Sequence, residues 1–220
     1  PRTSSAASDV YKRQLYAYAP LLKEEEKKYE NFSKSIRRRA ATIGGHNMDD
    51  YPLKMHVFNR ARLIKNSKNR IPYGVDLIQK YKRESWIVFT ENKKQAKEFN
   101  KIINTKGFKS ALYNTDLDST ERLENLNKFK KADLNVLVTC TALDEGFDMP
   151  EADGALILSA SSSKRQRVQR MGRVLRITEN KPNALIVTVY SSKTEFDKLM
   201  EEAKRYHKEG VPVSWKRQDR

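Results

Sequence analysis

Short apolar runs alternate with helical patterns between residues 86 and 203, and this alternation limits the fold more than any other feature of the chain. The runs contain few polar side chains, which is typical of strands that are covered on both faces. Parallel strands need crossover connections, and the helical patterns lie where those connections fall. We therefore predict an α/β fold with a parallel sheet sandwiched between helices. The predicted strands are Trp86–Phe89, Ser110–Tyr113, Val136–Val138, Ala155–Leu158 and Leu185–Val189.

Three helices are predicted between or after these strands. The first starts near Lys94 and ends at Gly107, since a glycine readily takes the left-handed conformation that closes a helix. The second starts at Asp118, and Glu121 three residues later completes a capping-box-like pattern. The third has its apolar residues on one helical face: Phe196, Leu199, Met200 and Ala203.

We expect four segments along the chain. Residues 1–14 have no apolar period and are expected to be disordered or non-native. Residues 15–83 are predicted to form a charged helical connector, interpreted as a solvated spacer in preference to a dedicated binding arm. Residues 84–209 hold the predicted sheet domain, and residues 210–220 are a tail.

The chain is strongly basic, with a formal net charge of +16 and a pI near 9.8. This charge favours a polyanionic partner, although it also suits an anionic membrane or solubility alone. No apolar run approaches the roughly 20 residues that span a bilayer, so we expect no membrane partner. Cys140 is the only cysteine, which excludes an internal disulfide and favours a reducing, cytoplasmic compartment, with nucleoid association if the protein is bacterial. The three histidines lack metal-ligand spacing, so we expect no zinc site.

A basic run at residues 166–176 has the spacing of an amphipathic helix. At about 100° per residue, Gln169, Arg173 and Arg176 fall on one face, within about 60° of each other. Two adjacent guanidinium groups suit phosphate binding, because each offers a planar fork of donors with a permanent charge. A solvated basic helix is the alternative interpretation.

Polar residues follow three of the predicted strands, where ligands bind in sheets of this kind. Thr90, Cys140 and Ser159 come at or just after the ends of these strands, and Thr141 follows Cys140. The hydroxyls of Thr139, Thr141 and Ser159 could donate to a nucleic-acid backbone, or serve as ordinary strand-end groups.

The loop after Thr141 contains two further candidates. Gly146 permits an unusual backbone angle or a close approach to a ligand. Asp148 is suited to sugar hydroxyls, or alternatively to capping a helix before Pro150.

These segments resemble a known family. Residues 136–148 look like motif V of superfamily 2 helicases, residues 169–176 look like motif VI, and residues 86–90 are similar to motif IV. Residues 60–72 are similar to the connector before the second lobe in the XPB/RadD-like branch. The resemblance covers roughly residues 84–205 and implies the second, C-terminal RecA-like lobe of an ATP-dependent DNA or RNA translocase of the DEAD/DEAH type.

The resemblance also implies roles for individual residues. Arg173 and Arg176 would be the arginine fingers that reach the nucleotide γ-phosphate, and arginine fingers contribute about 10³–10⁵ in rate. Gly146 and Asp148 would lie by the ribose and phosphates of the nucleotide, and Gln169 would belong to the same nucleotide-binding site.

Thr90, Cys140 and Thr141 would line the nucleic-acid track. Cys140 and Thr141 replace the Thr-Asp pair of the DEAD-box branch, which weakens any inference about the type of nucleic acid.

No Gly-x-x-x-x-Gly-Lys-Ser/Thr loop occurs in the chain, so the usual phosphate cradle is absent from it. We therefore expect a fragment without the first lobe, or a subunit that completes a site in trans with an N-terminal RecA-like lobe. ATP with Mg²⁺ would be bound mainly by that lobe, the nucleic acid would be DNA in preference to RNA, and the isolated chain would be inactive.

Two rival functions remain open at this point. The first is a non-catalytic basic module in which Lys164, Arg165, Arg167 and Arg170 bind nucleic-acid phosphates. The second is an unrelated doubly wound enzyme with a phosphorylated ligand. That enzyme needs a glycine-rich turn after the first strand, and residues 90–94 offer none.

Overall fold

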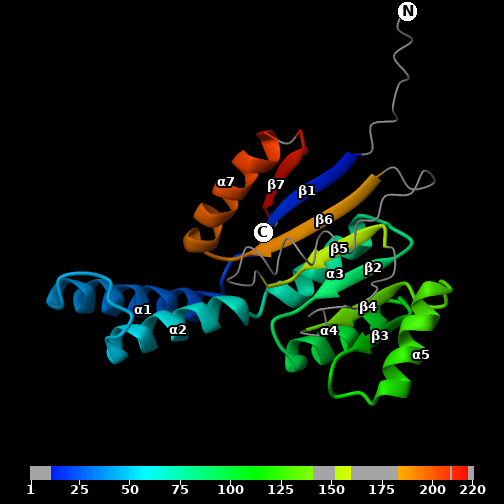
Figure 1. Cartoon of the computed structure of the whole chain (residues 1–220), viewed down its shortest axis with the longest axis horizontal. Helices are drawn as coiled ribbons and strands as arrows, with labels where there is room; N and C mark the ends of the chain where they lie inside the picture. Colours follow the sequence, from blue (N-terminus) through cyan, green and yellow to red (C-terminus); the bar gives the residue numbers. More distant parts are fainter. Residues whose placement is uncertain (1–10, 141–151, 160–182, 209, 218–220) are drawn as a thin grey trace, which may run out of the picture.

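The computed structural model describes residues 11–140, 152–159, 183–208 and 210–217. Seven strands form one sheet in the order β3-β4-β2-β5-β6-β1-β7, and every pairing is parallel (Figure 1). The predicted fold class is therefore confirmed. The strands are β1 Tyr11–Tyr18, β2 Trp86–Phe89, β3 Ser110–Tyr113, β4 Val136–Thr139, β5 Gly154–Ile157, β6 Asn183–Tyr190 and β7 Val213–Arg217.

The helices follow local signals in the sequence. The Asp118 carboxylate accepts a hydrogen bond from the Glu121 N–H at 2.8 Å, so the predicted start of α5 is confirmed. Gly107 has φ +85°, the left-handed conformation predicted after α4. The helices are α1 Lys23–Thr42, α2 Tyr51–Lys65, α3 Arg70–Lys80, α4 Lys93–Thr105, α5 Ser119–Lys130 and α7 Lys193–Lys208.

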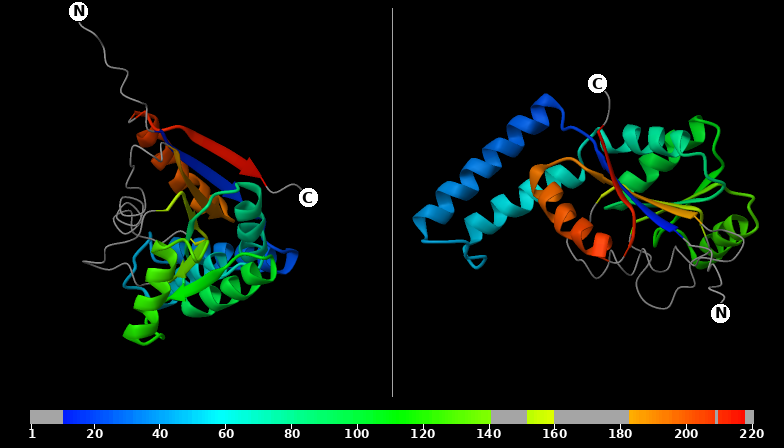
Figure 2. Two further views of the ribbon diagram at one scale, coloured as in Figure 1. Left: turned by 90° about the vertical axis from the view of Figure 1, so that its right-hand side faces the viewer. Right: turned by 90° about the horizontal axis from the view of Figure 1, so that it is seen from above.

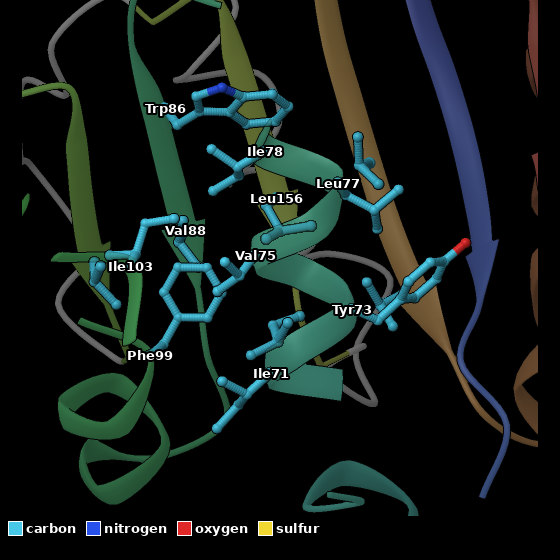
Figure 3. Close-up of a cluster of buried hydrophobic side chains, with 14 of the residues drawn as sticks. Ile71, Tyr73, Val75, Leu77, Ile78, Trp86, Val88, Phe99, Ile103 and Leu156 are labelled. Carbon is cyan, nitrogen blue, oxygen red and sulfur yellow. The ribbon is translucent and has the colours of Figure 1, made fainter. Parts of the chain in front are cut away.

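Helices cover both faces of the sheet (Figure 2). On one face, α3 and α4 pack against alternate residues of the strands, and α3 lies lengthwise along the sheet (Figure 3). On the other face, α5 packs against β3 and β4, and α7 packs against β1 and β6. The core on the first face is larger than the core on the second and is called here the larger core. It includes Ile71, Tyr73, Val75, Leu77, Ile78, Trp86, Val88, Phe99, Ile103 and Leu156.

Two strands at one side of the sheet, β1 and the edge strand β7, were not predicted from the sequence. Disorder was expected up to Gln14, but residues 11–14 belong to β1, which pairs with β6 and β7. A tail was expected after residue 210, but Val213–Arg217 is β7. The expectation of disorder is wrong at residues 11–14, and a strand within the tail was not predicted, because backbone pairing with neighbours distant in sequence holds both strands. The division into domains itself stays a prediction.

The predicted connector contains two different structures. Helix α3 is part of the body of the domain, because its apolar face lies in the larger core. Helices α1 and α2 form an antiparallel hairpin that projects from the end of the sheet (Figures 1 and 2). The hairpin has a small core of its own, made by Ile36, Ala40 and Leu53. Arg39 and Asp50 join its two helices by an ion pair of 2.6 Å.

Candidate functional site

The carboxyl ends of β2, β4 and β5 lie side by side, as the sequence predicts. Phe89 is in register with Thr139 on β4 and with Ile157 on β5. The backbone N–H of Thr90 donates to the Thr139 carbonyl at 2.8 Å, and that of Leu158 donates to the Phe89 carbonyl at 2.9 Å. The segments that follow these strands therefore start from one edge, called here the carboxyl edge.

Two of the predicted nucleic-acid contacts lie at this edge and are buried. Thr90 is 1% exposed and Cys140 is 3% exposed. The Thr90 hydroxyl lies within donating distance of two carbonyl oxygens, Thr139 at 3.1 Å and Asn92 at 3.2 Å. Cys140 belongs to the larger core. Both side chains thus have internal roles in this structure, and their contact with nucleic acid stays a prediction.

The other predicted site residues lie outside the described residues. They stay predictions, and nothing in the described part of the chain tests them. They are Thr141, Gly146, Asp148, Gln169, Arg173 and Arg176.

A network around Gln95 was missed by sequence reasoning. The Gln95 amide oxygen accepts from the Glu91 N–H at 2.9 Å and from the Ser159 hydroxyl at 3.1 Å. Its Nε2 donates to the Lys65 carbonyl at 3.1 Å, and the Ser159 hydroxyl also reaches that carbonyl at 2.9 Å. Gln95 therefore ties the end of α2 to the loops after β2 and β5. No sequence signal marks it, because two of its partners, Lys65 and Ser159, are 30 and 64 positions away.

Charged groups at the rim of the carboxyl edge are paired across segments. Lys65 Nζ lies 2.5 Å from Glu91 Oε1, and both side chains are about a quarter exposed, at 23% and 27%. Hydrogen bonds from Lys93 and then Lys97 hold the pKa of Asp116 below its usual range. These lysines are paired with carboxylates of the chain itself, so the ion pairs connect the segments at the rim.

Arg70 is a buried cation just behind this edge. Its Nη1 donates to the Leu158 carbonyl at 2.7 Å and to the Val189 carbonyl at 2.8 Å. Its Nη2 donates to both carboxylate oxygens of Glu195 at 2.6 Å. The side chain therefore fixes the ends of β5 and β6 relative to α3 and α7. The sequence contains Arg70 within the connector-like run at residues 60–72, but nothing there indicates its burial.

The described residues offer neither a metal-binding cluster nor a membrane span. Among them, no group of three or more His, Cys, Asp or Glu side chains could hold a metal ion. None of the described helices has the length and apolar character that a membrane span requires.

A family model described as "Helicase conserved C-terminal domain" matches residues 69–178. The chain belongs to this family. The match covers α3, the strands β2 to β5 and the basic run at residues 169–176. The resemblance to the C-terminal lobe of superfamily 2 helicases is therefore confirmed.

Curated relatives of this helicase domain include both DNA and RNA enzymes. The "DNA 3'-5' translocase XPB2" of Sulfurisphaera tokodaii is 30% identical over 193 residues, which cover 80% of this chain and 42% of that protein. The "ATP-dependent RNA helicase DBP3" of Ajellomyces capsulatus is 28% identical over 72% of this chain and 32% of that protein. The chain thus spans less than half the length of these relatives. The preference for DNA and the XPB/RadD-like branch stay predictions.

Solved helicase lobes have the same fold. The C-terminal domain of the DEAD-box protein Dbp5 superposes with a TM-score of 0.63 at 16% identity, over 94% of this chain and 90% of that chain. The Escherichia coli DEAD-box protein SrmB, solved with RraA, gives a TM-score of 0.58 at 13% identity, over 96% and 91%. These likenesses confirm the RecA-like architecture of the helicase domain.

Proposed function

We propose that this chain acts as the C-terminal motor lobe of an ATP-dependent nucleic-acid helicase or translocase. The helicase C-terminal match over residues 69–178 carries the proposal, because it includes the run with Arg173 and Arg176. In the proposed motor these two residues are the arginine fingers that face the γ-phosphate across the cleft between the lobes. A first RecA-like lobe, in cis or in trans, binds most of the ATP and Mg²⁺.

The remaining site residues divide between nucleotide and nucleic acid. Gly146, Asp148 and Gln169 lie near the ribose and phosphates in the proposed motor. Hydrolysis of the bound ATP supplies the energy for movement along the strand.

The nucleic-acid track in this proposal includes Thr90, Cys140 and Thr141. We propose DNA as the nucleic acid, supported by the likeness to the XPB2 translocase, and the net charge of +16 supports a polyanion of either kind. The lone cysteine supports a cytoplasmic location, with nucleoid association if the protein is bacterial.

Substitution of one arginine finger tests the motor directly. In the two-lobed protein that carries this chain, Arg173→Ala should lower ATP hydrolysis by about 10³–10⁵. DNA affinity should stay within about twofold, because the arginine faces the nucleotide and makes no contact with the strand. Arg167→Ala, just outside the motif VI run, is the matched control and should leave hydrolysis nearly unchanged.

The rival function, a non-catalytic binding module, makes the opposite prediction. Loss of Arg173 would then weaken DNA binding and make its salt dependence shallower, with no change in hydrolysis. The isolated chain provides a second test, since we propose that it has negligible ATPase activity. DNA-stimulated ATP turnover by the purified chain that disappears with Arg173→Ala would contradict this part of the proposal.

A further inference from the structure

The face of α2 that points away from α1 carries a row of exposed apolar side chains. Tyr51, Met55 and Phe58 are spaced i, i+4 and i+7, and they are 70%, 36% and 51% exposed. At about 100° per residue, this row lies roughly opposite Leu53, the fully buried residue by which α2 packs against α1. We call Tyr51, Met55 and Phe58, with Lys54 and Arg62 beside them, the outer face of α2.

The outer face is not needed to hold the hairpin together. The hairpin is closed from the opposite side by its own small core and by the Arg39–Asp50 ion pair. Single exposed apolar residues are ordinary, but a continuous row on one helix indicates a surface that another molecule covers. Tyrosine, phenylalanine and methionine are also the apolar residues that are enriched at protein interfaces.

Charge indicates which kind of partner fits. Helix α2 contains four Lys or Arg residues and no Asp or Glu. Two of the four are engaged with residues outside α2: Lys65 with Glu91, and Arg60 with Ser33 and the Tyr29 ring. The other two, Lys54 and Arg62, are exposed beside the apolar row. A second copy of this chain would bring like charges together, whereas an acidic partner would complement them.

The Phe58 ring favours a protein over a nucleic-acid strand at this position. Lys54 Nζ lies 5.8 Å from the ring centroid, so one face of the ring already has an ammonium group against it. Only the opposite face of the ring is left for a stacked base. An apolar side chain from a neighbouring helix can pack against the exposed part of the ring and leave Lys54 in place to pair with a carboxylate.

We propose that the outer face of α2 binds an amphipathic helix of an acidic partner protein. The bound helix presents apolar side chains at i, i+3 or i+4, and i+7, and Asp or Glu on both sides of that stripe. The carboxylates pair with Lys54 and Arg62 while the stripe covers Tyr51, Met55 and Phe58. This interaction is separate from the motor function and does not depend on it.

The test uses the full chain and synthetic peptides. The probe is a fluorescent 18-residue helical peptide with leucine at i, i+3, i+4 and i+7 and glutamate on the flanking positions. The matched peptide has lysine in place of each glutamate. Fluorescence anisotropy should show binding of the glutamate peptide and at least tenfold weaker binding of the lysine peptide. Rising salt should weaken binding of the glutamate peptide and narrow the difference between the two, because it screens both attraction and repulsion.

Substitutions then place the binding on the outer face. Phe58→Ala and Met55→Ala should each weaken glutamate-peptide binding by about tenfold, because buried aromatic and methionine anchors carry most interface energy. Leu123→Ala on α5 is the matched control, since Leu123 is 57% exposed and lies outside the hairpin. Circular dichroism should show unchanged helix content in all three variants.

Several outcomes would overturn the proposal. Equal binding of the two peptides would show that charge does not select the partner. Equal effects of Phe58→Ala and Leu123→Ala would show that the outer face is not the binding surface. Binding of a single-stranded oligonucleotide or a phosphatidylglycerol vesicle would be measured in the same variants. If that binding depends on Phe58 and peptide binding does not, the surface binds nucleic acid or lipid instead. Self-association that Phe58→Ala abolishes would assign it to a second copy.

Discussion

Arg70 and Glu195 lie 125 positions apart in the sequence and form a bidentate ion pair, with both contacts at 2.6 Å. The Arg70 side chain is fully buried, and that of Glu195 is 12% exposed. The other guanidinium nitrogens donate to the carbonyls of Ile64, Leu158 and Val189. One side chain thus connects two helices, two strands and the end of the hairpin behind the carboxyl edge.

We expect Glu195→Ala to destabilise the domain by about 3–5 kcal/mol, because it leaves a buried charge without its partner. Urea denaturation followed by circular dichroism measures this loss. Glu124→Ala removes an exposed i,i+4 pair with Lys128 and should cost only about 0.3–0.5 kcal/mol. A Glu195→Ala loss as small as the Glu124→Ala loss would show that Arg70 finds other compensation.

Gly154→Ala should disturb the packing of β5 against β2. A Cβ at this position would lie 2.5 Å from Cε3 of Trp86, a fully buried ring. Overpacking of this kind costs about 1–3 kcal/mol. Gly74→Ala should cost less, because its nearest contact, at 2.6 Å, is a terminal methyl of Leu158 that can rotate. Thermal unfolding of the two variants compares them, and a larger loss for Gly74→Ala would contradict the prediction.

The hairpin should lose stability in acid. Hydrogen bonding from Arg39, with further help from the Leu53 N–H, lowers the pKa of Asp50 below the ordinary value of 3.8. A carboxyl whose pKa is lowered on folding stabilises the folded state above its unfolded pKa, and this contribution is lost as the pH falls through the folded pKa. Carboxyl NMR titration should therefore show Asp50 with a midpoint below 3.8 that rises in Arg39→Gln. An unchanged midpoint in that variant would assign the lowered pKa to another cause.

Gln95→Leu should loosen the junction between α2 and the carboxyl edge. The substitution leaves the Glu91 N–H without its side-chain acceptor and takes one donor from the Lys65 carbonyl, at a cost of about 1–3 kcal/mol. Hydrogen exchange should accelerate first at residues 64–68 and around Glu91. Gln79→Leu on the exposed side of α3 is the control and should leave exchange there unchanged. Uniform acceleration over the whole sheet would mean global destabilisation instead.

The candidate site was only partly predictable from the sequence. The convergence of the segments after Phe89, Thr139 and Ile157 followed from the pattern of strands, since parallel strands end at one edge. The burial of Thr90 and Cys140 did not follow, because burial at a strand end depends on which helix covers it. The hydrogen bonds of Gln95 depend in the same way on side chains from three separate segments.

The sequence by itself determined the central strands and the helices between them, because fully apolar runs and helical caps are local signals. Only the tertiary structure decided that β1 and β7 complete the sheet, that Arg70 is buried, and that one face of α2 stays exposed. Strand β1 starts with polar residues, among them Arg13 and Gln14, before a short apolar run at residues 15–18. It is a strand because β6 pairs with its backbone. Nearly all residue types offer the same backbone donor and acceptor, so this pairing cannot be predicted from the sequence of the strand itself.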